Sequence, residues 1–339
     1  MSLLRSIRSS AYQVHIIWIF AAQMEKSQDM CLTFFLLFRR ASLFFVKYNV
    51  KSGRKLYFSP GHAMIKPSDR TEETALLTIG EYSRPQSLNE AYALCQKKNN
   101  VVLGGMLWLK MQHRRVGTAI DLCDLGLDRI EETADAYRIG AMVPLRALET
   151  HAGLAALTQG AMAEAVRHIV GVQFRNCATV GGSVWGRFGF SDVLTLLLAL
   201  DARVVLHHAG EMPLADFAAL PRNTRDILTQ IILPKTGGRT VYLSQRNIST
   251  DFSVLTCALS ERNGAYTCVI GARPMPAAVF ADEKGVLAQG ITEDSARAFA
   301  EDIAARAVLG GNMRASGDYR RAICKVLVRR AAMALSKEG

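Results

Sequence analysis

The pattern of apolar and polar positions predicts regular structure from about Leu76 onward. Ser87 and Glu90 have the spacing of a helix capping box, and apolar residues follow at the three- and four-residue intervals of one helix face. We therefore expect a helix here that ends at the pair Asn99-Asn100, because asparagine is a common helix stop.

Beyond this helix, short apolar runs of strand length alternate with longer segments of helix length. Strands are expected in VVL (101–103), IDLCDL (120–125), RIGAMVPL (138–145), RVVLHH (203–208) and DILTQIIL (226–233), and helices in residues 152–170 and 191–202. The last of these strands should stop at Pro234, because proline lacks the N–H that a strand ladder uses.

The last hundred residues place strands first and helices after them. Residues 236–238 resemble a linker, four β-like runs follow within 241–281, and Asn263-Gly264 predicts a hairpin turn between the second and third runs. Two helices are expected at 294–308, capped by Thr292, and at 316–335. Strands that cluster before helices predict an α+β fold. We divide the chain into an extension (1–75), a first domain (76–236) and a C-terminal domain (237–339).

Residues 1–75 differ from the rest of the chain. Apolar runs at 14–22 and 31–38 are shorter than the roughly 18–20 residues that a membrane-spanning helix needs. A basic start followed by a short apolar run imitates a signal peptide, but no A-x-A-like cleavage site follows clearly. We interpret this part as an extension that is poorly ordered or lies upstream of the true start. A membrane-touching anchor is the alternative.

Composition narrows the function classes. The 339 residues carry a formal net charge of +11, more than half of it in residues 1–75, and no basic stripe is interleaved with aromatic residues, so we expect no nucleic-acid partner. Seven cysteines lie far apart with no C-x-x-C pair, so the sequence predicts neither a zinc site, a disulfide framework nor an iron–sulfur cluster. Free thiols are typical of a cytoplasmic protein.

Two glycine pairs are the candidate binding chemistry. Gly104-Gly105 follows a predicted strand, and Gly181-Gly182 lies between two predicted helices. Because glycine lets backbone N–H groups converge on an anion, the two loops could hold the two phosphates of a dinucleotide, with Asp192 accepting hydrogen bonds from a ribose hydroxyl. Taken singly, each pair is more often a plain tight turn. Neither pair is a G-x-G-x-x-G or a Walker A motif.

Four ordered segments resemble the FAD-binding (medium) subunit of molybdenum hydroxylases, the xanthine dehydrogenase and carbon monoxide dehydrogenase flavoprotein family. LTIGEYSRPQSLNEAYALC (77–95) resembles the family's opening, and VLGGMLWL (102–109) resembles its first FAD loop, AGGTDLL. RNCATVGGSV (175–184) resembles its second loop, RNxATxGGN, and DYRRAICKVLVRRA (318–331) resembles its C-terminal helix, YRRxLxxVLVRRA. The resemblance covers residues 76–339.

The resemblance implies an FAD-binding domain of the vanillyl-alcohol-oxidase/CO-dehydrogenase flavoprotein (PCMH) type, followed by a small antiparallel-sheet-plus-helices domain. It implies that the first loop wraps the pyrophosphate, that the second contacts flavin and phosphate, and that Asp192 binds the adenosine-side ribose. The implied cofactor-binding residues are Val101, Val102, Leu103, Gly104, Gly105, Met106, Leu107, Trp108, Ile169, Thr179, Val180, Gly181, Gly182, Ser183, Asp192 and Leu228.

Four positions depart from the family's pattern. Met106 and Leu107 stand where the family often has a hydroxyl residue and an aspartate, and Ser183 replaces an asparagine. Leu243 stands where a lysine is often found. Because a thioether cannot donate a hydrogen bond, phosphate binding at the first loop would rely on backbone N–H groups.

The implied function is electron transfer within a multi-subunit, xanthine dehydrogenase-like molybdenum hydroxylase. Electrons would pass from [2Fe–2S] clusters on an iron–sulfur subunit to FAD and on to NAD or another acceptor, and molybdopterin would reside on a molybdenum-cofactor subunit. No residue of this chain needs to act as a general acid or base, and no metal ligand is expected. Two alternatives stay open: a non-catalytic interaction or assembly protein that keeps the fold but has lost FAD, and a stand-alone flavin oxidase.

Three further residues have two interpretations each. Arg175 either meets a phosphate or caps the preceding helix, and Trp108 and Trp185 either stack on the flavin or belong to the core. We also expect Gly181→Val to abolish FAD retention while leaving the fold mostly intact.

Overall fold

The computed structural model describes residues 32–36, 44–49, 54–58 and 77–337, and the chain divides into two compact units, Met1–Glu73 and Thr74–Gly339. In the first unit, three strands form an antiparallel sheet in sequence order: β1 (Leu32–Leu36), β2 (Phe44–Asn49) and β3 (Arg54–Phe58). The apolar run at 14–22 and most of the predicted extension lie outside the described residues. No helix in the described ranges is long and apolar enough to cross a membrane.

The second unit begins with a small parallel sheet in the order β4-β6-β5. Its elements are β4 (Thr78–Ser83), α2 (Leu88–Cys95), β5 (Val101–Val102), the 3-10 turn η2 (Leu109–Met111) and β6 (Arg115–Ile120). The predicted helix is confirmed, with the Ser87 hydroxyl accepting from the Glu90 N–H at 3.2 Å. It ends earlier than expected, and the Asn100 side chain donates to the Leu94 carbonyl in its last turn at 2.9 Å.

A five-stranded antiparallel sheet in the order β10-β9-β11-β8-β7 forms the centre of the unit. Its strands are β7 (Ile130–Glu132), β8 (Ala136–Gly140), β9 (Arg203–Leu206), β10 (Gly210–Pro213) and β11 (Leu228–Pro234). Seven helices accompany it: α3 (Leu145–Thr150), α4 (Ala152–Leu157), α5 (Ala161–Arg167), α6 (Val172–Cys177), α7 (Val180–Trp185), α8 (Asp192–Ala199) and α9 (Leu214–Ala219).

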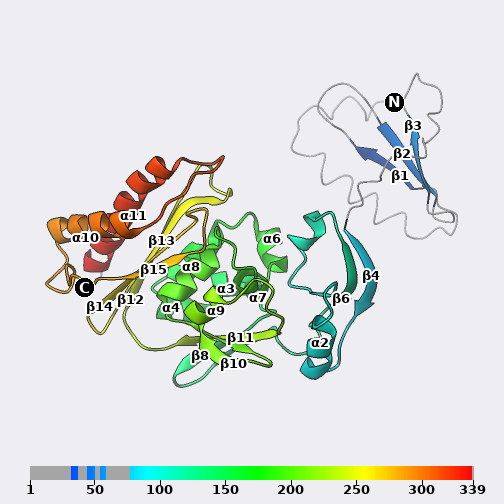
Figure 1. Ribbon diagram of the computed structural model, residues 1–339, viewed down its shortest axis with the longest axis horizontal. Coiled ribbons are helices and arrows are strands. Elements are labelled where there is room, and N and C mark those ends of the chain that lie inside the picture. The colour runs from blue at the N-terminus through cyan, green and yellow to red at the C-terminus, as the bar shows by residue number, and fades with distance from the viewer. Residues whose placement is uncertain (1–31, 37–43, 50–53, 59–76, 338–339) are drawn as a thin grey trace, which may run out of the picture. The chain divides into compact units, whose positions relative to one another are not determined.

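The C-terminal part is a four-stranded antiparallel meander followed by two helices. These elements are β12 (Arg239–Arg246), β13 (Ser253–Arg262), β14 (Ala265–Gly271), β15 (Ala278–Ala281), α10 (Glu293–Arg306) and α11 (Gly317–Lys337). Figure 1 shows α10 and α11 on one side of this sheet and α8 on the other. The sheet therefore lies between two cores, and the predicted α+β class is confirmed.

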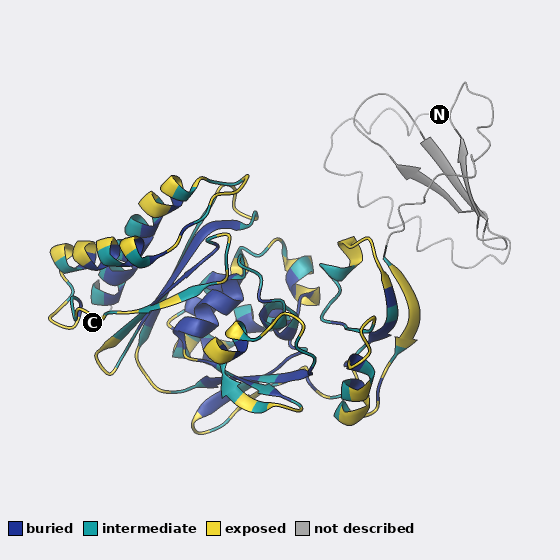
Figure 2. Ribbon diagram, viewed as in Figure 1, coloured by how far each residue is buried: buried dark blue, intermediate teal, exposed yellow. Residues whose placement is uncertain are grey.

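Burial on both faces explains why the longest run, SVLTCALSE, does not alternate strictly between apolar and polar residues. Ala258 and Val269 face the core shared with α8, while Cys257 and Cys268 face the core under α10 and α11. Figure 2 shows the central strand β13 largely buried and the outer faces of the two helices exposed. A strand buried on both faces reads as a continuous apolar run.

Two predicted elements are wrong in position. The strand expected in IDLCDL lies earlier, as β6, because the chain turns at Asp121, whose carboxylate accepts from the Cys123 N–H at 3.0 Å. The helix expected at 152–170 is split into α4 and α5, because Gln159 and Gly160 have left-handed φ angles of 44° and 85°. The sequence pattern did not predict β4, because its residues are nearly all exposed and form no apolar run.

Candidate functional site

The first glycine pair opens a segment whose backbone donors face no protein acceptor. Gly105 and Met106 are consecutive left-handed residues, with φ angles of 81° and 60°, between β5 and η2. Within the part of the chain that the structure describes, the N–H groups of residues 104–108 donate to no carbonyl or side chain. Five successive free donors on a half-buried segment form a concavity suited to an anion.

The second glycine pair lies in the first turn of helix α7, and not in an irregular loop. Thr179 is the N-cap, and its hydroxyl accepts from the Gly182 N–H at 3.1 Å. The Val180 and Gly181 N–H groups donate to the carbonyls of Val143 and Ala141, at 2.9 and 2.7 Å. These donors are already used within the protein, so of the two glycine segments only the first offers free backbone donors.

The two glycine pairs touch each other. A Cβ added at Gly104 would lie 3.1 Å from the Gly182 Cα, and one added at Gly182 would lie 2.9 Å from the Gly104 carbonyl oxygen. Gly105 is equally close to the second segment, because a Cβ there would lie 2.0 Å from the Cys177 carbonyl. Two motifs nearly eighty residues apart thus form one surface, and side chains at these glycines would push the segments apart.

Gly181 lines the cavity with its backbone, but a side chain added there would point into the protein core. A Cβ there would lie 2.6 Å from the carbonyl oxygen of the buried residue Ala141. The expectation that Gly181→Val leaves the fold mostly intact is therefore wrong, because a valine would collide with the backbone beside β8.

A cavity of about 580 Å³ runs along the surface that the two segments form. It is lined by fourteen of the sixteen residues expected from the sequence: Val101, Val102, Leu103, Gly104, Met106, Leu107, Trp108, Ile169, Thr179, Gly181, Gly182, Ser183, Asp192 and Leu228. The other two, Gly105 and Val180, do not line it, and Val180 is fully buried in the core. Cavities of this size hold ligands of cofactor dimensions.

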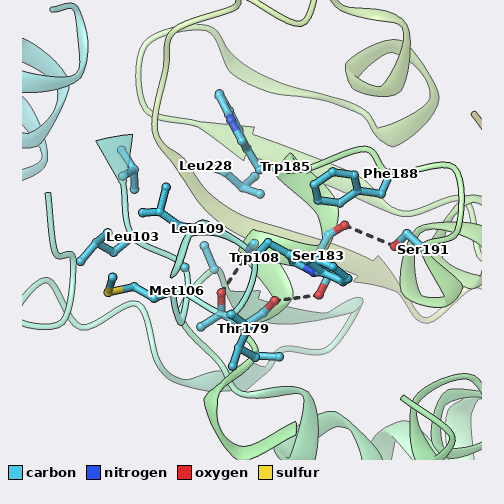
Figure 3. Close-up of a pocket in the computed structure, with 18 of the residues that line it drawn as sticks. Leu103, Met106, Trp108, Leu109, Thr179, Ser183, Trp185, Phe188, Ser191 and Leu228 are labelled. Atoms are coloured by element: carbon cyan, nitrogen blue, oxygen red, sulfur yellow. Dashed lines mark hydrogen bonds between the residues drawn. The ribbon is translucent and has the colours of Figure 1, made fainter. Parts of the chain in front are cut away.

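Hydrogen bonds fix the wall that α7 contributes to the cavity. Ser183 Oγ donates to the Thr179 carbonyl at 2.9 Å, and Ser191 Oγ donates to the Ser183 carbonyl at 3.3 Å (Figure 3). The hydroxyl of Ser183, which stands where the family often has an asparagine, therefore donates its hydrogen bond within its own helix. Figure 3 also shows the Met106 thioether directed away from Thr179, so this side chain is not aimed at the second segment.

Asp192 sits at the start of α8 with one carboxylate oxygen saturated. Its Oδ1 accepts from the Tyr242 hydroxyl at 2.6 Å, the Arg246 guanidinium at 2.7 Å and the Ser253 hydroxyl at 2.8 Å. Within the described residues, Oδ2 accepts no hydrogen bond, and Asp192 lines the cavity. Complete burial, together with the Asp192 charge, raises the pKa of Tyr242 well above its ordinary value, so Tyr242 stays a hydrogen-bond donor.

Arg246 is a cavity residue that the sequence reasoning missed. Leu243 was compared with the family's lysine, but it packs into the core under α10 and α11. Arg246 lies on the opposite face of β12, beside Tyr242, and lines the cavity. Its side chain is 7% exposed, and its Nε is buried without an acceptor in the described structure. Strand periodicity was the signal that could have found it, because residues 242, 244 and 246 share one face.

Four aromatic rings cluster in one part of the cavity lining, which we call its aromatic end. Trp108 contacts Phe188, Phe190 and Phe252, with ring centroids 5.9, 5.4 and 5.5 Å apart. These rings come from the first glycine segment, the chain after α7, and the β12–β13 connection, so the cluster joins three parts of the unit. Trp185 also lines the cavity, and it packs on Phe217 at 5.6 Å against the core.

Arg175 has a structural role. Its Nε donates to Glu149 at 2.7 Å and its Nη1 to the Ile169 carbonyl at 3.1 Å, and its side chain is 6% exposed. These donors are turned to Glu149 and to the carbonyls that follow α5, and Arg175 does not line the cavity, so the structure does not aim it at a phosphate there. Burial raises the pKa of Glu149, but hydrogen bonds from Arg175 and Arg146 outweigh burial and bring it below the ordinary value.

Comparison with known proteins shows which proteins this chain resembles. Residues 77–236 match the family described as the FAD binding domain in molybdopterin dehydrogenase. The uncharacterized protein YgfM of Escherichia coli K12 is 31% identical over 159 residues, which are 46% of this chain and 59% of that protein. The glyceraldehyde dehydrogenase medium chain of Sulfolobus acidocaldarius is 25% identical over 270 residues, which are 74% of this chain and 96% of that one.

Solved structures agree on the fold. A chain of carbon monoxide dehydrogenase from Hydrogenophaga pseudoflava aligns with a TM-score of 0.67 at 23% identity, covering 76% of this chain and 98% of that one. The match to YgfM spans 59% of that relative's length. The resemblance to the FAD-binding medium subunits of molybdenum hydroxylases, first inferred from the sequence motifs, is confirmed.

Proposed function

We propose, because residues 77–236 belong to the FAD-binding domain family of molybdopterin dehydrogenases, that this protein is the FAD-binding electron-transfer subunit of a molybdenum hydroxylase. One observation carries the proposal: residues 104–108 have five successive free backbone N–H groups, and four of these residues, all but Gly105, line the cavity beside Gly182. A dinucleotide supplies the anion that such donors need.

The residues present fit FAD in three respects. The pyrophosphate would be held by the backbone N–H groups of residues 104–108, so the loss of a hydroxyl and a carboxylate at Met106 and Leu107 removes no donor from this set. A ribose hydroxyl would donate to the free Oδ2 of Asp192. The unpartnered Nε of Arg246 would donate to an oxygen or nitrogen acceptor of the cofactor.

When bound, FAD supplies the two-electron redox chemistry, and the protein binds and orients it. The aromatic end of the cavity, formed by Trp108 and the phenylalanines around it, excludes water and offers ring faces for stacking. Asp192 and Arg246 hold the β12 strand against α8, which keeps the cavity wall fixed. No side chain is required to move a proton in this scheme.

The proposal extends to partners and acceptor. Electrons would reach this subunit from [2Fe–2S] clusters on an iron–sulfur subunit, molybdopterin would reside on a third subunit, and NAD would be the final acceptor in a xanthine dehydrogenase-like arrangement. A cytoplasmic location fits this scheme. Support comes from the relatives, one of which is named as the medium chain of a glyceraldehyde dehydrogenase.

The experiment that tests the proposal is co-expression of the full chain with iron–sulfur and molybdenum subunits from the same genome, followed by purification and cofactor analysis. We expect a complex that contains FAD, iron and molybdenum, and whose flavin absorption near roughly 450 nm bleaches on addition of an oxidisable substrate. A stable complex that contains iron and molybdenum but no flavin would instead favour the assembly-protein alternative.

A further inference from the structure

A second cavity, of about 300 Å³, adjoins the first at its aromatic end. Phe190, Phe252 and Arg222 line both cavities and form the wall between them. The second cavity is also lined by Gly189 and Ser253, by the chain after β14, including Met275, and by Asn312 and Arg314 from the connection between α10 and α11. None of these latter residues lines the first cavity, so the second has chemistry of its own.

Three side chains of this cavity, Arg222, Arg314 and Asn312, carry hydrogen-bond donors, while the Ser253 hydroxyl already donates to Asp192. Arg222 donates to the carbonyls of Gly186 and Arg187, and no carboxylate in the described ranges pairs with it. Arg314 has its guanidinium 4.6 Å from the centre of the Phe252 ring, pairs with Asp251 at 3.3 Å, and has a buried Nε without an acceptor. No carboxylate lines the cavity.

The Asn312 amide is held in one orientation. Its Oδ1 accepts from the Arg320 guanidinium at 2.7 Å and from the Arg314 backbone N–H at 3.0 Å. These two bonds fix the oxygen, so the amide nitrogen must be the free end, and it finds no acceptor in the described structure. Arg320 is 1% exposed and also donates to the Gly310 and Ala315 carbonyls, which makes the Asn312 loop rigid. A donor on a rigid loop is pre-organised for a ligand.

We propose that this second cavity binds a planar aromatic molecule of one or two rings that carries oxygen acceptors. The rings of Phe190 and Phe252 provide apolar faces for such a molecule, and Asn312, Arg314 and Arg222 provide donors for its oxygens. The volume is at the lower limit of ligand pockets, which excludes a whole dinucleotide. Quinones and aromatic carboxylates both have this chemistry. The site goes beyond the proposed function: it shares Phe190, Phe252 and Arg222 with the first cavity, while Asn312 and Arg314 belong to it alone.

The shared wall couples the second cavity to the first. A ligand in the second cavity would touch the reverse side of the rings at the aromatic end of the first, so its binding should change the affinity for a molecule in the first cavity. Such coupling is reciprocal between two sites.

The test measures binding of two probes, the quinone menadione and the carboxylate 2-naphthoate, to the full-length protein by equilibrium dialysis, with and without saturating FAD. We expect one of them to bind at one site per chain in both states. Asn312→Asp keeps the oxygens that Arg320 holds but replaces the free amide donor with a charged acceptor, so binding should weaken about tenfold or more. Met275→Trp should fill the cavity and abolish probe binding.

Met111→Trp is the matched control, because Met111 is 58% exposed and lines neither cavity. It should leave both affinities unchanged. The proposal is overturned if neither probe binds below about 1 mM, a level of weak binding. It is also overturned if FAD competes the probe away while Asn312→Asp has no effect, because the probe would then occupy the first cavity. If the protein does not bind FAD, the probe affinities measured without FAD still test this proposal.

Discussion

The backbones of Gly104 and Gly182 lie in van der Waals contact, so that a Cβ on Gly182 would come within 2.9 Å of the Gly104 carbonyl oxygen. This contact joins the end of β5 to the first turn of α7 and sets the width of the cavity between them. The free donors of residues 104–108 are held at this point. Since the contact leaves no room for a side chain, its glycines are required by geometry.

Gly182→Ala should weaken FAD binding by about tenfold to a hundredfold, because the added methyl group must displace the Gly104 backbone. Isothermal titration of the purified variant with FAD measures the effect. Gly171→Ala is the control, because its Cβ would meet only the flexible Gln173 side chain at 3.2 Å. Equal affinities in the two variants would show that the glycine contact does not shape the site.

The two carboxylate oxygens of Asp192 should have separable roles. Tyr242→Phe removes a donor from Oδ1 only, so we expect it to lower the free energy of unfolding by about 1–2 kcal/mol with little change in FAD affinity. Asp192→Asn should lower both the free energy of unfolding and the FAD affinity, because it also alters Oδ2. Urea unfolding and FAD titration of both variants test this. If Asp192→Asn binds FAD as tightly as Tyr242→Phe, the ribose assignment fails.

Val170→Gly should stabilise the protein by about 1 kcal/mol. Val170 has a left-handed φ of 49°, which is strained for a β-branched residue, and its side chain is 46% exposed, so little packing is lost. Val172 is similarly exposed but has an ordinary helical position, so Val172→Gly should not stabilise. Urea unfolding of both variants decides the matter, and destabilisation by Val170→Gly would contradict the strain argument.

The Glu149–Arg175 pair should make the free energy of unfolding depend on pH in the acid range. The pKa of Glu149 is lower in the folded protein than in the unfolded chain. Its contribution is therefore fully present above the ordinary glutamate pKa, about 4.3, and is lost as pH falls through the lower folded value. Glu149→Gln should cost about 2 kcal/mol of unfolding free energy at pH 7, and this difference should shrink below about pH 4. A difference that stays constant from pH 7 to pH 3 would rule out ionisation as the cause.

Sequence patterns predicted the apolar elements well and the polar ones poorly. The helix after Ser87 and the four-strand meander followed by two helices were predicted, because burial forces apolar residues into periodic positions. β4 was missed because its residues are exposed. The break between α4 and α5 depends on the left-handed angle at Gln159, which composition does not reveal.

For the site, the sequence motifs predicted which residues line the cavity but not how they act. The second glycine pair was expected to offer N–H groups to a ligand, yet the Gly181 N–H donates to the Ala141 carbonyl. That bond depends on the tertiary packing of α7 against the chain after β8, and no local pattern encodes it. Arg246 was missed because alignment to a family lysine selected Leu243, which is on the wrong face of its strand.

The most direct test of the central claim is a titration of the full-length, FAD-free protein with FAD, in which intrinsic tryptophan fluorescence is the signal. Trp108 and Trp185, two of the three tryptophans in the chain, line the first cavity, so bound flavin should quench them. We predict saturable quenching at one FAD per chain, with FAD retained on desalting and quenching weakened in Gly182→Ala. Fluorescence that does not saturate, with no flavin retained, would contradict the assignment of this cavity to FAD.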